Sequence, residues 1–104
     1  MGRTESLWRH GDVFIQSCGE VPSSARLLPH CILAKGEVTG HAHRIAERDS
    51  AQLFLQDEIL YLRVAEKRAT VVHEEHAPIV LERGNYRVWI QREYSPEAIR
   101  RVVD

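Results

Sequence analysis

Apolar and polar residues alternate over short stretches of this sequence, and turn-forming residues interrupt the alternation every few positions. This pattern is typical of strands with one buried face, and no helical period appears before the end of the chain. It predicts eight strands, over residues 12–17, 30–35, 41–45, 52–56, 58–64, 69–74, 78–81 and 86–93.

Turn signals separate these segments and predict where the chain reverses. Turns are expected at Asp57-Glu58, at Glu66-Lys67-Arg68 and at Gly84-Asn85, the last a tight turn because both residues tolerate positive φ. Near the C-terminus, Ser95 is suited to cap a helix that begins at Pro96. We therefore predict an all-β fold, a small barrel or sandwich of about seven to eight short strands with a short C-terminal helix or arm.

The length of 104 residues predicts a single β-barrel-like domain spanning residues 1–104. Hydrophobic residues make up 43% of the chain and charged residues 28%, as in soluble globular proteins. No apolar run approaches the roughly 20 residues of a membrane helix, and the N-terminus resembles no secretory signal. We expect a cytoplasmic protein without membrane contact. Exposed strand edges in so small a chain favour a homo-oligomer.

The cysteine spacing and the arginine content exclude only a few classes of site and function. Cys18 and Cys31 do not have the spacing of a zinc ribbon or a redox motif, so we expect two buried, reduced thiols. The net charge of −1 argues against a strongly basic nucleic-acid binder. Twelve arginines accompany only two lysines, which suits phosphate or carboxylate binding but also follows from a GC-rich genome.

Four of the six histidines fall within two short segments, "GHAHR" and "VVHEEHAP". His41 and His43 share one face of a strand because side chains two residues apart point the same way. His73 continues the face of Ala69 and Val71, and His76 joins it if the chain bends within Glu74-Glu75. We therefore predict that all four imidazoles converge on one site.

Such a site has three interpretations. In the first, His41, His43, His73 and His76 bind a divalent transition metal such as zinc, iron, nickel or copper. Glu74 or Glu75 would then be a further ligand, a partner of a ligand or the general base of a hydrolase.

In the second interpretation, two histidines act without metal as the general acid and base of an endoribonuclease. Arg44 and Arg87 would bind the phosphate of the RNA. In the third, the histidines are structural and the protein is a non-catalytic interaction module. The first interpretation leads, with the ribonuclease as the alternative.

The two remaining histidines and four aromatic residues have structural or functional interpretations. His10, beside Gly11, approaches the site or is a turn residue, whereas His30, between Pro29 and an apolar strand, is expected to be structural. Aromatic residues at strand positions either pack in the core or form a base-stacking platform. These are Trp8, Tyr61, Tyr86 and Trp89.

The order G-x-x-x-G-H-x-H, followed by strands and further histidines, resembles a reduced cupin, which implies a metal held by His41 and His43. The second cupin block differs, because His73 and His76 precede Pro78 and Gly84 instead of following them. The stretch from "HGDV" to "REYSPEAIRRVVD" more closely resembles small bacterial and phage-associated proteins carrying "GEVTGHAH" and "HEEHAPI". This second resemblance implies a shared design and adds no particular activity.

Overall fold

The computed structural model describes residues 7–36, 40–47 and 49–90, and within these ranges the chain forms eight strands and no helix. The predicted C-terminal helix or arm lies outside the described residues. The strands are β1 (Leu7–His10), β2 (Val13–Cys18), β3 (Arg26–Leu27), β4 (Ile32–Lys35), β5 (Ala42–Ile45), β6 (Ala51–Gln56), β7 (Ile59–Val72) and β8 (Ile79–Ile90). In the part of the chain that the structure covers, no helix is long and apolar enough to cross a membrane.

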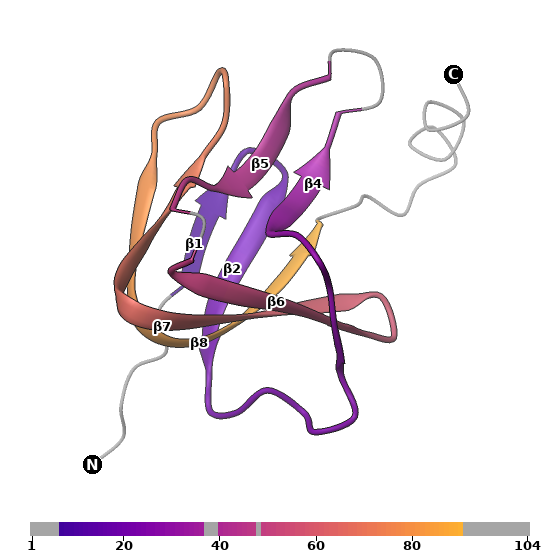
Figure 1. Cartoon of the computed structure of the whole chain (residues 1–104). Helices are drawn as coiled ribbons and strands as arrows, with labels where there is room; N and C mark the ends of the chain where they lie inside the picture. Colours follow the sequence, from indigo (N-terminus) through magenta and orange to yellow (C-terminus); the bar gives the residue numbers. More distant parts are fainter. Residues whose placement is uncertain (1–6, 37–39, 48, 91–104) are drawn as a thin grey trace.

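All strand pairs are antiparallel, and the long strands β7 and β8 organise the sheet. The main path of neighbours is β1-β2-β8-β7-β5-β4, while β6 pairs with the first half of β7 and with β3. Figure 1 shows β7 and β8 curving together along their length. Because β5 and β6 pair with different halves of β7, that one strand connects two regions of the sheet.

Two predicted turns are wrong, because the chain continues through them as strand. The predicted strands 58–64 and 69–74 merge into β7, and 78–81 merges with residues 86–90 into β8, whereas residues 91–93 of the predicted last strand lie outside the described residues. At Glu66-Lys67-Arg68 the register slips between β7 and β8: Val64 pairs with Gly84 but Arg68 pairs with Glu82. Residues 65–67 therefore face residue 83 alone, and this β-bulge bends the two strands together.

Two features of β8 accommodate the bend. Gly84 has a φ of 150°, which a residue with a side chain rarely adopts. The Tyr86 hydroxyl donates a 2.5 Å hydrogen bond to the carbonyl of Glu82 across the same bend. The turn predicted at Asp57-Glu58 is confirmed: both residues have positive φ, 52° and 67°, as tight two-residue hairpins require.

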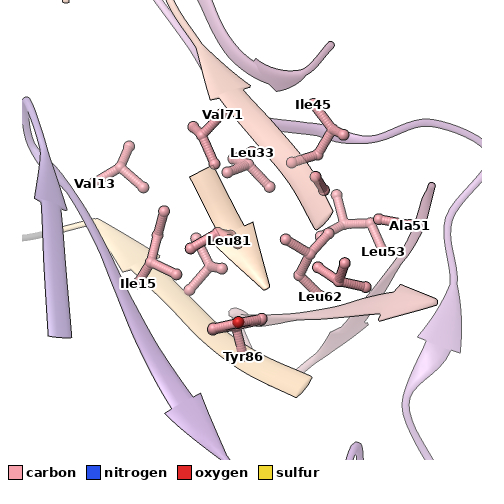
Figure 2. Packing of buried hydrophobic residues seen from close by; sticks show 13 residues of the cluster. Val13, Ile15, Leu33, Ile45, Ala51, Leu53, Leu62, Val71, Leu81 and Tyr86 are labelled. Carbon is pink, nitrogen blue, oxygen red and sulfur yellow. The ribbon is translucent and has the colours of Figure 1, made fainter. Parts of the chain in front are cut away.

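Thirteen buried apolar residues form one core within the curved sheet (Figure 2). Ile15, Leu53, Leu62 and Leu81 are fully buried, and Figure 2 shows side chains from several strands meeting in the centre. Full burial of such a side chain stabilises a fold by about 1.5–3 kcal/mol. The core thus follows from the inward positions of the alternating pattern.

The prediction of a barrel is wrong in one respect: the described strands form an open sheet. Its path ends at β1 on one side and at β4 on the other, and no strand pair among the described residues joins these ends. The all-β class and the upper predicted number of strands are confirmed. β1 and the two-residue β3 were not predicted, because both are too short to show a clear alternation.

Candidate metal centre

Three histidines occupy inward positions at the ends of three strands. On β1 His10 is inward, on β5 His43 precedes the inward Ile45 by two residues, and His73 follows the inward Val71 of β7 by two. The apolar core therefore ends in a row of imidazoles. Alternation alone produces this placement, because each histidine continues the buried face of its strand.

The predicted convergence of the two histidine segments is confirmed. The ring centroids of His43 and His73 are 4.2 Å apart, those of His73 and His76 4.7 Å, and those of His41 and His73 5.5 Å. One ring nitrogen from each of His43, His73 and His76 can be chosen so that all three lie within 4.8 Å of one another. These residues form the histidine cluster, together with His41 and His10.

His10 belongs to this cluster, although the sequence left its place open. It is only 2% exposed, and its Nδ1 lies 2.8 Å from Nδ1 of His43. Its Nε2 lies 2.9 Å from the carbonyl oxygen of Ala77, which can only accept a hydrogen bond. A neutral His10 therefore carries its proton on Nε2 and accepts at Nδ1.

The same hydrogen bonds decide the tautomer of His43. Because Nδ1 of His10 accepts, Nδ1 of His43 must donate, and Nε2 of His43 keeps a free lone pair. Ring nitrogens that bind metals are commonly oriented in this way, by a partner that accepts from the other nitrogen of the ring. His10 is thus a positioning residue for His43.

Burial and neighbouring rings keep these two histidines neutral. The pKa of His43 is lowered from 6.5 to about 4, mainly because burial penalises the charged form and further because His73, His10 and His76 would repel the charge. Burial likewise lowers the pKa of His10, partly offset by its hydrogen bond to Ala77. At neutral pH both rings are unprotonated bases, the form that binds metal ions.

Glu74 connects the segment after β7 to β5. One carboxylate oxygen accepts a 3.1 Å hydrogen bond from the amide of Ala42, and the other lies 3.2 Å from Nη1 of Arg44. The backbone hydrogen bonds to Ala42 and to its own amide are the main causes of a lowered pKa at Glu74. With His41 and His73, Glu74 forms a second group of three candidate ligands within 4.8 Å.

Glu75 lies on the exposed side of the cluster. Its carboxylate is 3.9 Å from Nδ1 of His41, and its side chain is 69% exposed. Its amide donates a 3.0 Å hydrogen bond to Nδ1 of His73. A neutral His73 that accepts at Nδ1 carries its proton on Nε2.

Gly11 forms a close-packed wall of the cluster. A Cβ added there would lie 2.8 Å from Nε2 of His76 and 3.1 Å from Cε1 of His43, and Gly11 has a φ of +65°. Arg9 donates a 3.0 Å hydrogen bond from Nε to the Gly11 carbonyl. Only glycine fits this turn between β1 and β2, for both conformational and steric reasons.

The two arginines predicted to bind phosphate lie in different places. Arg44 contacts Glu74, which lies beside the histidine cluster, whereas Arg87 donates a 2.7 Å hydrogen bond to Gln16 on β2. The Nδ1 of His30 accepts from the Ile32 amide at 3.1 Å, a structural contact. Cys18 and Cys31, expected to be buried, are both only half-buried, and burial raises the pKa of Cys31.

The fold and this cluster define a class of small all-β protein with a histidine-rich group that could hold a metal ion. Residues 9–91 match the family described as a domain of unknown function (DUF8820). The chain therefore belongs to this family, and the matched range includes every residue of the histidine cluster. No curated protein and no solved structure matches the chain.

Proposed function

We propose that the protein binds a divalent transition-metal ion through His43, His73 and His76, with His41 as a further candidate ligand. The observation that carries this proposal is the grouping of three imidazole nitrogens within 4.8 Å of one another. Zinc–imidazole bonds of about 2.0–2.1 Å in tetrahedral geometry separate the nitrogens by about 3.4 Å. Binding then needs only a modest approach of side chains that already face each other.

The chemistry of the donors supports the proposal. His43 offers a free lone pair at Nε2 and stays neutral at pH 7, because its pKa is lowered to about 4. Imidazole ligands suit zinc, iron, nickel and copper, in keeping with the ions expected from the sequence. The cupin resemblance of the H-x-H pair points to the same chemistry.

Metal binding by His73 has a structural cost at Glu75. Ligation through Nδ1 would displace the Glu75 amide directly, and ligation through Nε2 would put a proton on Nδ1, which could then no longer accept. In either case the Glu75 amide loses its partner. We therefore expect the amide resonance of Glu75 to be among those that shift most when metal is added.

We further propose that the metal site has a hydrolytic activity. Three protein ligands leave one position open, at which a metal ion supplies an activated water. Glu75 is the better candidate for the general base, because its carboxylate is exposed near His41. Glu74 already accepts hydrogen bonds from Ala42 and Arg44 through its two oxygens and is better suited to positioning.

The test is metal binding by protein purified without a polyhistidine tag. We expect stoichiometric zinc or nickel by elemental analysis, and a loss of at least tenfold in affinity for His43→Ala and for His73→Ala. His30→Ala is the matched control, because His30 is held by the Ile32 amide and belongs to neither ligand group. Folded protein that retains no metal, or equal loss in all three variants, would contradict the proposal.

A metal-free endoribonuclease is the second candidate, and the position of Arg44 favours it. Arg44 follows His43 on β5 and so points to the other face of that strand, but it lies 3.2 Å from Glu74, which groups with His41 and His73. There Arg44 could bind a phosphate close to these two imidazoles. His43 would act as the base and another ring of the cluster as the acid. RNA cleavage that survives a chelator but is lost in His43→Ala would favour this activity over metal binding.

A further inference from the structure

The sheet face opposite the core has a composition of its own. Alternation places Arg9, Phe14, Arg87, Trp89, Phe54 and Arg63 outward, and we call these residues the arginine–aromatic face. Tyr61 completes it, because Tyr61 pairs with Arg87 on one side and with Phe54 on the other. The buried neighbours of these residues, such as Ile15 and Val88, point into the core.

Across β1, β2 and β8, two aromatic rings lie between two arginines. The rings of Phe14 and Trp89 are stacked, with centroids 5.7 Å apart and planes inclined by 16°. The guanidinium carbon of Arg9 lies 5.5 Å from the centre of Phe14, and that of Arg87 lies 5.4 Å from the centre of Trp89. The two rings therefore stack on each other, and an arginine lies over each of them.

A further arginine–ring pair lies across β6 and β7. The guanidinium carbon of Arg63 lies 4.9 Å from the centre of the Phe54 ring. The strand register places Tyr61 between this pair and Arg87. The face therefore crosses β1, β2, β8, β7 and β6 without interruption.

The charge of this face differs from that of the whole chain. Three arginines occupy its outward positions, while the outward strand positions of β1, β2, β6, residues 59–64 of β7 and residues 85–90 of β8 include no carboxylate. Of the acidic residues near these positions along the chain, Asp12, Asp57 and Glu58 lie in turns and Glu66 lies in the bulge of β7. A net charge of −1 thus conceals a local excess of positive charge.

We propose that the arginine–aromatic face binds single-stranded nucleic acid. Bases would stack on the rings of Phe14, Trp89 and Tyr61, taking the places of the arginines that now lie over Phe14 and Trp89, and these arginines would turn outward to contact the phosphates. Half-buried rings beside exposed cations on a sheet suit unpaired bases, whose faces are accessible, and not duplexes, whose bases are already stacked. This proposal does not rest on the histidine cluster, because His10 points to the other side of β1 from Arg9.

The proposal predicts how the affinity for single-stranded nucleic acid depends on salt concentration. Each phosphate neutralised on a single strand contributes about −0.7 to the slope of log K against log salt concentration. Three arginines predict a slope of about −2. Removing one arginine should make the slope shallower by about 0.7.

The experiment is fluorescence anisotropy of the full chain with labelled oligo(dT) and oligo(U) of about 12 nucleotides, a length within the range of known single-strand sites. We expect both to bind more tightly than a duplex of equal length. Trp89→Leu and Phe14→Leu should each weaken binding about tenfold, since they keep apolar bulk but remove a stacking ring. Arg87→Gln should weaken binding and reduce the slope.

Arg68→Gln is the matched control, because Arg68 is an exposed arginine on β7 beyond the bulge and outside the face. It should leave affinity unchanged. Far-ultraviolet circular dichroism and thermal melting of each variant establish that the fold is kept. Absence of binding by folded wild-type protein would overturn the proposal, as would preference for duplex or equal loss in Arg68→Gln. Self-association through this face in place of oligonucleotide binding would overturn it as well.

Discussion

His10 and His43 face each other through like atoms, with Nδ1 of one 2.8 Å from Nδ1 of the other. Such a contact is a hydrogen bond only if one ring donates and the other accepts, and the Ala77 carbonyl at Nε2 of His10 decides which. One backbone carbonyl therefore determines which nitrogen of His43 is available for chemistry.

The first prediction follows from this relay. His10→Ala removes no proposed ligand but leaves Nδ1 of His43 without its acceptor. We expect metal affinity to fall about 10–100-fold, the usual effect of losing the partner of a liganding histidine. Competition titration with a zinc chelator dye measures it. An affinity equal to wild type would show that His10 does not orient His43; His30→Ala serves as the control for a histidine outside the cluster.

A second prediction concerns Gly11. Gly11→Ala places a Cβ 2.8 Å from Nε2 of His76, so the imidazoles must shift and metal binding should weaken at least tenfold. Gly40→Ala is a matched control, because Gly40 also has positive φ, +78°, but an added Cβ would meet nothing within 4 Å. Both variants should lose about 1 kcal/mol of stability from backbone strain. Isothermal titration with zinc separates them, and an equal loss of affinity in both would refute a steric role for Gly11.

The third prediction is a pH dependence of stability in metal-free protein. Unfolded His43 takes up a proton near pH 6.5, but folded His43 does so only near its lowered pKa of about 4. Acid therefore favours the unfolded state, and the free energy of unfolding should fall as the pH drops from about 6.5 toward 4. The lowered pKa of His10 acts in the same direction.

Urea denaturation in the presence of chelator at several pH values measures this effect. His43→Asn should show a shallower decline than wild type, and His30→Asn should follow the wild-type curve. A decline of the same steepness in His43→Asn would mean that other groups cause the acid sensitivity.

The fourth prediction tests the bend in β8. Tyr86→Phe keeps the ring, which packs edge-on against Trp8 at 5.7 Å, but removes the hydrogen bond from the hydroxyl to the Glu82 carbonyl. We expect a loss of about 0.5–1.5 kcal/mol in unfolding free energy, with unchanged metal affinity. Guanidinium denaturation checks the first part. No change in stability would mean that the bulge and Gly84 hold the bend without this bond.

The sequence predicted the histidine cluster better than it predicted the course of the strands. His73 could be placed because it continues the buried face of Ala69 and Val71, and alternation is a local property. The polar run Glu66-Lys67-Arg68 reads as a turn for the same local reason, yet its strand continues because β8 supplies a partner on the other side of the bulge. That pairing depends on residues far along the chain, which no local pattern reveals.

His10 shows the limit of pattern reading most clearly. A polar residue before Gly11 at the end of a four-residue strand looks like part of a turn. Its burial depends on Ala77 and His43, which are 67 and 33 residues away. The available signal was the period of two from Trp8 to His10, followed by a glycine. The sequence pattern also did not separate core aromatic residues from outward-facing ones: Tyr86 is in the core, while Trp89 faces outward.

Because the sheet is open, the histidine cluster also links two strands that are not hydrogen-bonded to each other. Backbone pairing leaves β1 and β5 unconnected, and the contact between His10 and His43 bridges them instead. An ion bound by His43 would fix the ring that His10 contacts, and would thereby hold β1 against β5, two strands that do not pair with each other in the described structure. Amide exchange in β1 and β5 should then slow when metal binds, so that exchange rates in these two strands would report occupancy of the centre without any assay of chemistry.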